Sequence, residues 1–472
     1  MASFTGGRRN TVAGLVARLV VCTALLSVWA AHADQGGEPA GYIDPGYLAV
    51  KDLLSDERKV RRDAVRRLID GGDPGLAFGI VDALFFIPSA LRRDAFEALE
   101  GLTGEAVGTS YWDWVEWAGR AGEEIRPTPG YDRWKVVLLS KIDPGYADML
   151  YAGAPTRIRL EEVVPGGVRI EGIPSLDFPP MVAAAAATYL KDDEDVFGVE
   201  LGGEVRAYPL RFLDWHEMLN DDIGGRSVSL SYCTLCGSGV LYDTGPTGAG
   251  RCFATSGLLY RSNKLMFDRE TRTLWSNLYG EPVLGALASE PETHRLTVLP
   301  MTRTTWQDWR RKHPSTTVVA LTKELKKEGR KHGFDYRPGK ANAARRGVSF
   351  PVWKKSAALP PETEVYVLRL GGAVRAYPLD RLPASGLVHD MVGGQPVLLI
   401  HDAEAGSVRV YRRDETFRRV DGRLQSADGR VWEIHEDALV SGETRLERLP
   451  GHFAFWFGWY AFFPQTEIYD PS

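Results

Sequence analysis

The strongest constraint on the fold of this chain is an internal duplication. The segment "VFGVELGGEVRAYPL" at 196–210 returns as "VYVLRLGGAVRAYPL" at 365–379, a shift of 169 residues. Further along, "RLTVLP" at 295–300 returns as "RLERLP" at 445–450, a shift of only 150 residues. Two tandem copies of one unit explain both matches, and the difference between 169 and 150 places 19 fewer residues inside the second copy.

The repeated segment has the pattern of a β-hairpin, whereas the chain before it has the pattern of helices. Gly202-Gly203 separates two β-rich runs, as a two-residue hairpin loop requires. Earlier, "RRDAVRRL" at 61–68 recurs as "RRDAFEAL" at 92–99, with apolar residues at helical spacing, and resembles short HEAT-type helix pairs. We therefore predict an α+β chain, in which an N-terminal HEAT-like α-helical block precedes two tandem related, mainly antiparallel β-rich units.

The first residues of the chain have the pattern of a signal peptide. Three arginines and an apolar run at 19–30 precede Ala31-His32-Ala33, which offers the small residues of a cleavage site. The run is too short to span a bilayer as a helix, so we expect an exported chain, periplasmic or extracellular, with no integral membrane segment when mature. The predicted divisions are a signal peptide at 1–33, the helical domain at 34–127, the first β-rich unit at 128–330 and the second, degenerate unit at 331–472.

Charge excludes one class of partner. Residues 1–33 contain three of the 57 basic residues and no acidic ones, so the rest of the chain has 54 basic and 62 acidic residues. No stripe of basic residues indicates binding of nucleic acid. The helical block is interpreted as a cap packed on the main domain, and a surface for a protein partner is the alternative.

The duplication also indicates where chemistry lies. By the 169-residue register, Ser385, Gly386, Asp402 and Ala405 take the places of His216, Glu217, Cys233 and Cys236. The second copy keeps the β framework and lacks all four chemically capable residues together. We therefore expect the first copy to carry a site and the second to be its structural partner.

Three interpretations of this site stay open. Two thiolates of a C-x-x-C knuckle and one imidazole suit Cu(I) or Zn(II), so the first hypothesis is a soft-metal site of His216, Cys233 and Cys236. The second is an extracytoplasmic thiol-disulfide oxidoreductase, with Cys233 attacking and Cys236 resolving. Against it, no basic residue flanks Cys233, and Cys233 follows a strand instead of opening a helix. The third is a non-catalytic interaction scaffold.

A third cysteine, Cys252, is not expected to join the pair. If residues 236–252 form a simple hairpin, Cys252 lies about 20 Å from Cys236 at ~3.4 Å per residue. We predict a buried thiol at this position.

Several motifs carry a resemblance to a known family. They include "DWHEMLND", "YCTLCGSG", "SGLLYRSNKLMFDRETRTLWS" and "FWFGWYAFFPQTEIY". With them the chain resembles the bacterial and archaeal family called domain of unknown function 3179, from which no activity can be carried over. The resemblance implies His216, Cys233 and Cys236 as site elements, with a second polar group of Ser256, Asn263, Asp268 and Trp275.

The second polar group also has a structural interpretation. Asn and Asp are common turn residues, and Trp275 is a typical core residue. As a functional group, Arg261 and Asp268 would line a pocket beside the thiols, together with Glu217, Ser256 and Asn263. The chain has no Gly-rich phosphate loop, nucleophile elbow or His-Glu-x-x-His motif, which excludes the standard nucleotide-dependent and hydrolase patterns.

Overall fold

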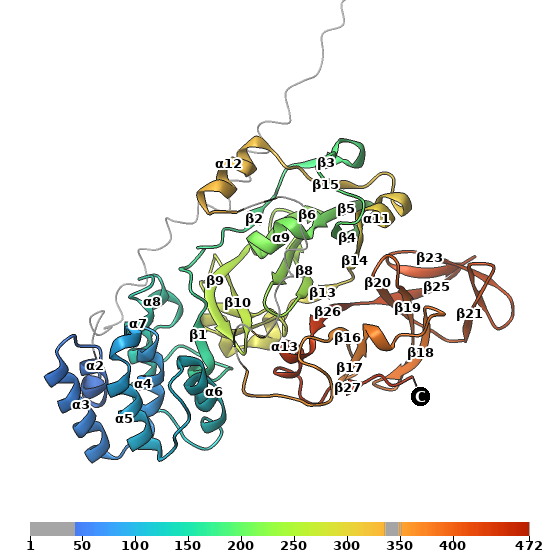
Figure 1. The fold of residues 1–472 in the computed structure, drawn as a ribbon. Coiled ribbons are helices and arrows are strands. Elements are labelled where there is room, and N and C mark those ends of the chain that lie inside the picture. The colour runs from blue at the N-terminus through green and yellow to red at the C-terminus, as the bar shows by residue number, and fades with distance from the viewer. Residues whose placement is uncertain (1–42, 335, 337–347, 349, 351, 472) are drawn as a thin grey trace, which may run out of the picture.

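The computed structural model describes residues 43–471, apart from 335, 337–347, 349 and 351. The helical block lies at one end, the first β unit in the middle and the second β unit at the other end (Figure 1). The predicted α+β class is confirmed. The predicted signal peptide, residues 1–33, lies outside the described residues. Within the described part of the chain, no helix has both the length and the apolar character of a membrane span.

The helical block continues to Met149. The helices that carry the repeated motif pack against each other, and Arg61 Nε donates to Asp94 across this contact at 2.8 Å. The block's core includes residues from Tyr47 to Leu138. Its helices are α2 (Leu48–Asp52), α3 (Arg58–Gly71), α4 (Leu76–Leu84), α5 (Arg93–Thr103), α6 (Tyr111–Ala121), α7 (Tyr131–Leu139) and α8 (Tyr146–Met149).

The first β unit consists of three five-stranded sheets. Their strand orders are β14-β4-β5-β15-β3, β13-β8-β7-β6-β2 and β1-β9-β10-β11-β12. The strands are β1 (Val163–Pro165), β2 (Leu176–Asp177), β3 (Met181–Ala183), β4 (Asp195–Leu201), β5 (Glu204–Pro209), β6 (Met218–Ile223), β7 (Arg226–Cys233), β8 (Ser238–Pro246), β9 (Phe253–Tyr260), β10 (Asn263–Asp268), β11 (Leu274–Ser276), β12 (Glu281–Leu284), β13 (Thr297–Leu299), β14 (Thr302–Thr305) and β15 (Thr317–Val319). The helices are α9 (Leu210–His216), α10 (Pro291–His294), α11 (Trp306–Lys312) and α12 (Lys323–Lys331).

The second β unit has a four-stranded sheet, β26-β16-β17-β27, and an eight-stranded sheet, β18-β19-β20-β25-β24-β23-β22-β21. Its elements are β16 (Glu364–Leu370), β17 (Ala373–Pro378), β18 (Leu387–Val392), β19 (Gln395–Asp402), β20 (Ser407–Arg412), β21 (Phe417–Val420), β22 (Arg423–Ser426), β23 (Val431–Ile434), β24 (Ala438–Ser441), β25 (Thr444–Leu449), β26 (Gly451–Phe455), α13 (Trp456–Tyr460) and β27 (Glu467–Ile468).

Strand registers confirm the duplication. Val196 pairs with Pro209 in the first hairpin, and Val365 pairs with Pro378 in the second, at the same shift of 169. The parallel strands that follow keep the shift of 150, because Thr317 pairs with Arg206 where Glu467 pairs with Arg375. The two copies differ mainly in the insert between the matched strands. The insert is residues 247–296 in the first copy and 413–443 in the second, 50 residues against 31, which accounts for the 19 missing residues.

The two units meet through equivalent strands. The Arg303 guanidinium on β14 lies 3.9 Å from the ring centroid of Phe453 on β26, which is its own counterpart at the shift of 150. Arg303 also pairs with Glu364 on β16, with 3.0 Å between Nη2 and Oε2. A residue that touches its own counterpart marks a pseudo-two-fold arrangement, as in an isologous dimer interface.

Candidate functional site

The C-x-x-C motif forms a tight turn between two paired strands. Cys233 ends β7 and pairs with Ser238, which begins β8. The turn closes at Gly237, whose φ of 59° is accessible to glycine at little strain. Both cysteines are reduced, with 1% and 0% of their surface exposed, and they lie within hydrogen-bonding distance of each other. Cys236 faces the backbone oxygen of Ser262 at 2.9 Å. The two sulfur atoms therefore share one closed site.

A buried lysine reaches this site from the insert of the first copy. The register of β10 shifts between Lys264 and Met266, which marks a β-bulge. There the backbone N–H of Lys264 donates to Cys233, and Nζ donates to the backbone oxygen of Glu217. The side chain is 4% exposed, and burial lowers the pKa of Lys264 to about 8 despite the opposing charges of Glu217 and Cys233. No basic residue flanks Cys233 in the sequence, and Lys264 brings a basic side chain to it from a distant strand.

The two thiols differ in acidity. Burial alone would raise the pKa of Cys233, but the hydrogen bond from Cys236, the Lys264 N–H and the Lys264 ammonium together hold that pKa below its ordinary value. Burial and the adjacent Cys233 raise the pKa of Cys236 well above its ordinary value, although a hydrogen bond from Asn263 acts in the opposite direction. Cys233 is therefore the more acidic thiol of the pair and Cys236 the less acidic one.

Glu217 borders the same group. It follows α9 with a φ of 57°, a left-handed conformation that is strained for a residue with a side chain. This conformation directs its backbone oxygen at Lys264 Nζ and at the Tyr232 N–H, which donates at 2.8 Å. Thr234 donates to the Glu217 carboxylate at 3.1 Å. The half-buried carboxylate thus places a negative charge beside the thiols and Lys264.

Asparagine and serine side chains complete the surroundings of the thiols. Asn263 and Asn277 donate their amides to Ser238 Oγ at 3.2 and 3.4 Å. The Oδ1 atoms of both asparagines are buried and have no hydrogen-bond partner among the described residues, and the same holds for the hydroxyls of Ser231 and Ser262. Buried polar groups without partners are rare in proteins and often mark a site.

The second unit covers the thiols. The Phe455 N–H on β26 donates to the Cys236 backbone oxygen at 2.7 Å. A methyl group added to Gly458 of α13 would lie 2.7 Å from Cys236 Sγ. Helix α13 therefore packs directly on Cys236, and the site of the first unit is closed by the second.

His216 lies in a different environment. Its Nδ1 is 2.7 Å from the backbone oxygen of Pro174, and its Nε2 is 2.5 Å from Tyr336 Oη. The ring stacks on Tyr336, and burial lowers the pKa of His216 to about 4. Among the described residues, no group of three His, Cys, Asp or Glu side chains could hold a metal ion. The structure thus does not bring His216 into a ligand group with Cys233 and Cys236.

Two residues of the predicted pocket have structural partners. Ser256 Oγ donates to the Leu265 backbone oxygen at 2.6 Å and supports the bulge. Asp268 accepts from the Thr271 N–H at 2.7 Å and from Trp275 Nε1 at 2.9 Å, so it fixes the turn after β10. Trp275 is fully buried in the core. These contacts match the structural interpretation of Asp268 and Trp275.

Arg261 lines a cavity, as part of the turn that carries Ser262. It donates to Glu162 through Nε and Nη2 at 2.7 and 3.0 Å. The cavity has a volume of about 540 Å³ and is lined by Thr156, Arg157, Ile158, Arg159, Tyr260 and Arg261. Of the predicted pocket residues, Asn263 hydrogen-bonds to Cys236, and Glu217 acts on both thiols through its charge.

The predicted hairpin and the full burial of Cys252 were wrong, whereas Cys252 is a reduced thiol, as predicted. Strands β8 and β9 belong to different sheets, so residues 236–252 do not form a simple hairpin. Cys252 is half-buried. The insert turns the chain away after β8 to build the sheet that covers the thiol face.

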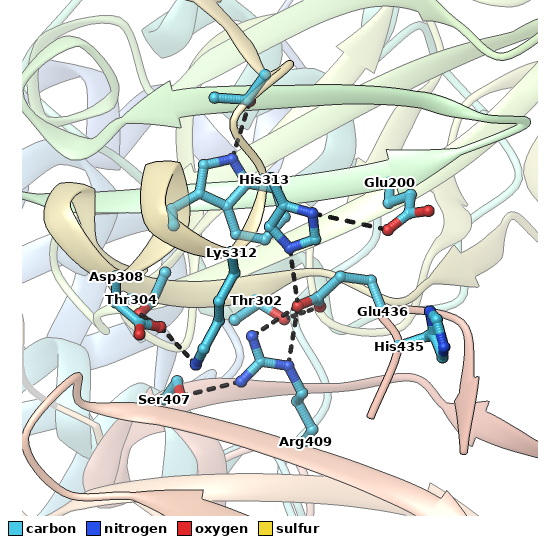
Figure 2. Close-up of polar contacts among 12 residues, drawn as sticks. Glu200, Thr302, Thr304, Asp308, Lys312, His313, Ser407, Arg409, His435 and Glu436 are labelled. Carbon is cyan, nitrogen blue, oxygen red and sulfur yellow. Dashed lines mark hydrogen bonds and ion pairs between the residues drawn. The ribbon is translucent and has the colours of Figure 1, made fainter. Parts of the chain in front are cut away.

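Close to the counterpart of Cys233, the second copy makes an ion cluster with the first. Asp402 pairs with Ser407 as Cys233 pairs with Ser238, and its Oδ1 accepts from the Ala405 N–H at 3.0 Å. On the same strand as Ser407, Arg409 binds Glu436, which also approaches His313 of the first unit at 3.5 Å, as Figure 2 shows. Glu436 and His313 thus join the two units beside this position.

The comparison with protein families agrees with the motifs. The family model described as protein of unknown function (DUF3179) matches residues 170–466, which is more than half of the chain. The chain belongs to this family. No curated protein and no solved structure matches the chain.

Sequence reasoning missed Lys264 and Asn277. Lys264 follows Cys233 by 31 residues and belongs to a different sheet, so spacing gave no link between them. One signal was present, because a lysine directly before the apolar run "LMF" is unusual in a buried strand.

Proposed function

We propose that Cys233 and Cys236 form a redox-active dithiol, and that the first β unit is a thiol oxidoreductase. The observation that carries the proposal is the contact of Lys264 with Cys233, through the backbone N–H and through the ammonium charge. It supplies the activation that helix N-termini and flanking basic residues supply elsewhere. Oxidation joins the two sulfur atoms and releases two electrons and two protons, and reduction reverses both.

The difference between the two thiols supports a fixed order of reaction. Cys233 attacks as the thiolate, while Cys236 keeps its proton until it resolves the intermediate. The proton that Cys236 then loses has two acceptors nearby, the Glu217 carboxylate and the neutral form of Lys264. Because the pKa of Lys264 is about 8, this amine exchanges protons readily at neutral pH.

A redox titration tests the proposal. The chain from residue 34 to 472 would be equilibrated with mixtures of reduced and oxidised dithiothreitol, quenched with acid and alkylated. Mass spectrometry would then measure the fraction of the chain that is oxidised. We expect one two-electron transition that is absent from Cys233→Ser and from Cys236→Ser. A wild-type chain that forms no disulfide at any ratio would contradict the proposal.

Lysine variants sharpen this test. Lys264→Met removes the charge that stabilises the reduced thiolate, so the midpoint should move to a more reducing potential. Alkylation of Cys233 at pH 7 should also slow, by about 3- to 10-fold. Lys312→Met is the matched control, because Lys312 lies 3.9 Å from Asp402, the counterpart of Cys233. It should leave both quantities unchanged.

Soft-metal binding is the second candidate, since two adjacent buried sulfur atoms suit Cu(I). The thiols would be its ligands without His216, whose ring nitrogens already have partners. Zn(II) would need further ligands. Cu(I) uptake by the wild type and by His216→Ala, but not by Cys233→Ser, is the expected result for this candidate. Equal uptake by all three would contradict it.

We also propose that the chain is exported. The support is the leader pattern in residues 1–33. Fractionation of cells that produce the full chain, followed by N-terminal sequencing, should give an exported protein that begins at Asp34. An intracellular protein that retains residues 1–33 would contradict this.

A further inference from the structure

Access to the dithiol limits what can react with it. Cys233 is 1% exposed and Cys236 is not exposed at all. Helix α13 and β26 pack on Cys236 so closely that Gly458 has no room for a methyl group. A protein disulfide must bring its own sulfur atom in line with the attacking thiolate, which this cover prevents. A reactant of a few atoms needs far less opening.

Polar groups without partners surround the same thiols. Ser231 lies on the Cys233 face of β7, because alternate residues of a strand share a face. Asn263 and Asn277 converge on Ser238, which pairs with Cys233. The asparagine oxygen atoms accept hydrogen bonds, and the Ser231 hydroxyl both donates and accepts. Such a set matches a small molecule with hydroxyl hydrogen atoms.

We infer that the oxidant of the dithiol is a small hydroperoxide, held against Cys233 by Ser231, Asn263 and Asn277. This inference rests on the proposed function and names its substrate class. A hydroperoxide is a two-electron oxidant of a few atoms, and its product, water or a small alcohol, is equally small. Its O–H can donate to an asparagine oxygen while its oxygen atoms accept from Ser231.

The reaction balances in two steps. The Cys233 thiolate attacks one oxygen of R–O–O–H, a sulfur–oxygen bond forms and the oxygen–oxygen bond breaks. The leaving oxygen takes a proton from Lys264, so the products are a Cys233 sulfenic acid and R–OH. The Cys236 thiol then attacks the Cys233 sulfur, a disulfide forms, and hydroxide leaves with the thiol proton as water. Two thiols lose two electrons and the peroxide gains them.

Hydrogen peroxide is the probe for the test. The reduced chain, residues 34–472, would be mixed with hydrogen peroxide, quenched at intervals and alkylated. Mass spectrometry would measure the oxidation of each cysteine over time. We expect the Cys233–Cys236 disulfide to form at least about 10-fold faster than Cys252 is oxidised in the same chain. In Cys236→Ser the sulfenic acid of Cys233 should persist and be trapped by dimedone. Cys252→Ser is the matched control and should leave the disulfide rate unchanged.

The holding groups are tested separately from the thiols. Ser231→Ala and Asn277→Ala should each lower the rate with hydrogen peroxide by about 10-fold, while the midpoint with dithiothreitol stays unchanged. A purely structural role for these residues would move both or neither, and either result would overturn their assignment.

Failure of the inference differs from failure of the proposed function. If hydrogen peroxide oxidises Cys233 no faster than Cys252, while dithiothreitol still gives the two-electron transition, the hydroperoxide inference is overturned and the dithiol remains. If the dithiothreitol transition is also absent, the proposed function itself is overturned.

Discussion

The two β units of this chain place a buried cysteine pair in one copy and a contact between the units in the other, at the same register of one framework. Cys233 and Ser238 pair across a strand turn in the first copy, and Asp402 and Ser407 pair at the same register in the second. The first pair is buried against an inserted sheet, whereas Asp402 lies 3.9 Å from Lys312 of the other unit. The strands hold the two counterpart residues at the same register. The insert determines which side chains surround each of them.

The insert explains most of this difference. In the first copy it supplies β9 to β12, and with them Lys264 and Asn263. In the second copy it supplies β21 to β24 and the turn with Glu436, and residues 413–443 contain no lysine. Lys264 and Asn263, which lie beside the thiols, therefore come from the segment in which the two copies differ.

The largest expected effect comes from replacing Cys233 with serine, compared with the same replacement at its counterpart, Asp402. Cys233→Ser should abolish the two-electron transition completely, because a dithiol cannot form from one thiol. Asp402→Ser, the same change at the counterpart, should leave the transition unaltered. Titration of both variants with dithiothreitol measures the contrast. A normal transition in Cys233→Ser would break the comparison.

The second largest effect should come from the ion cluster between the units. Glu436 is buried, and although burial alone would raise its pKa, Arg409 and Arg448 hold it well below the ordinary value. Glu436→Gln leaves both arginines without a counter-charge, so the free energy of unfolding should fall by about 3 to 5 kcal/mol. Denaturant unfolding measures the loss.

The control for this variant is Glu433→Gln, because Glu433 is an exposed glutamate three residues before Glu436. It should change stability by less than about 0.5 kcal/mol. The folded fraction of Glu436→Gln should keep the wild-type redox midpoint. A changed midpoint would mean that the second copy takes part in the thiol chemistry.

Particular residues show how far the sequence could predict these features. The hairpins and their register were predictable, because "LGGEVRAYPL" and "LGGAVRAYPL" repeat the same turn and the same alternation. The adjacency of Cys233 and Cys236 was predictable, because only two residues separate them. The place of Lys264 was not, since a β-bulge between two distant strands directs it.

His216 has contacts that the sequence did not indicate. Its absence from the second copy, where Ser385 stands, drew it into the predicted metal site together with the cysteines. In the structure, the segment after α12 brings Tyr336 onto the ring, and this contact has no local sequence signal. Absence from the second copy therefore gave no information about the contact of His216 with Tyr336.

The third prediction uses this histidine. The ordinary pKa of histidine is 6.5, and burial lowers the pKa of His216 to about 4. Between these values the unfolded chain binds a proton that the folded chain does not. The contribution of His216 to stability is therefore fully present above pH 6.5 and is lost as the pH falls toward 4, by at most about 3 kcal/mol.

Denaturant unfolding at a series of pH values checks this dependence. His216→Gln should be less stable at pH 7 and should lose less stability than the wild type between pH 6.5 and 4. His435→Gln, at an exposed histidine of the second unit, should follow the wild-type curve. Identical slopes for wild type and His216→Gln would contradict the prediction.

The smallest effect is expected where the second copy closes the site of the first. Gly458 occupies the position of Asp308, whose side chain accepts from Lys312 at 2.7 Å in the first copy. At Gly458 any side chain would clash with Cys236, because an added methyl group would lie 2.7 Å from its sulfur atom. Gly458→Ala should force α13 outward, lower the free energy of unfolding by about 1 to 2 kcal/mol and speed alkylation of Cys236. Gly71→Ala, with open space around its added methyl, should do neither. Unchanged alkylation of Cys236 in a destabilised Gly458→Ala chain would mean that the thiols are reached by another route than beneath α13.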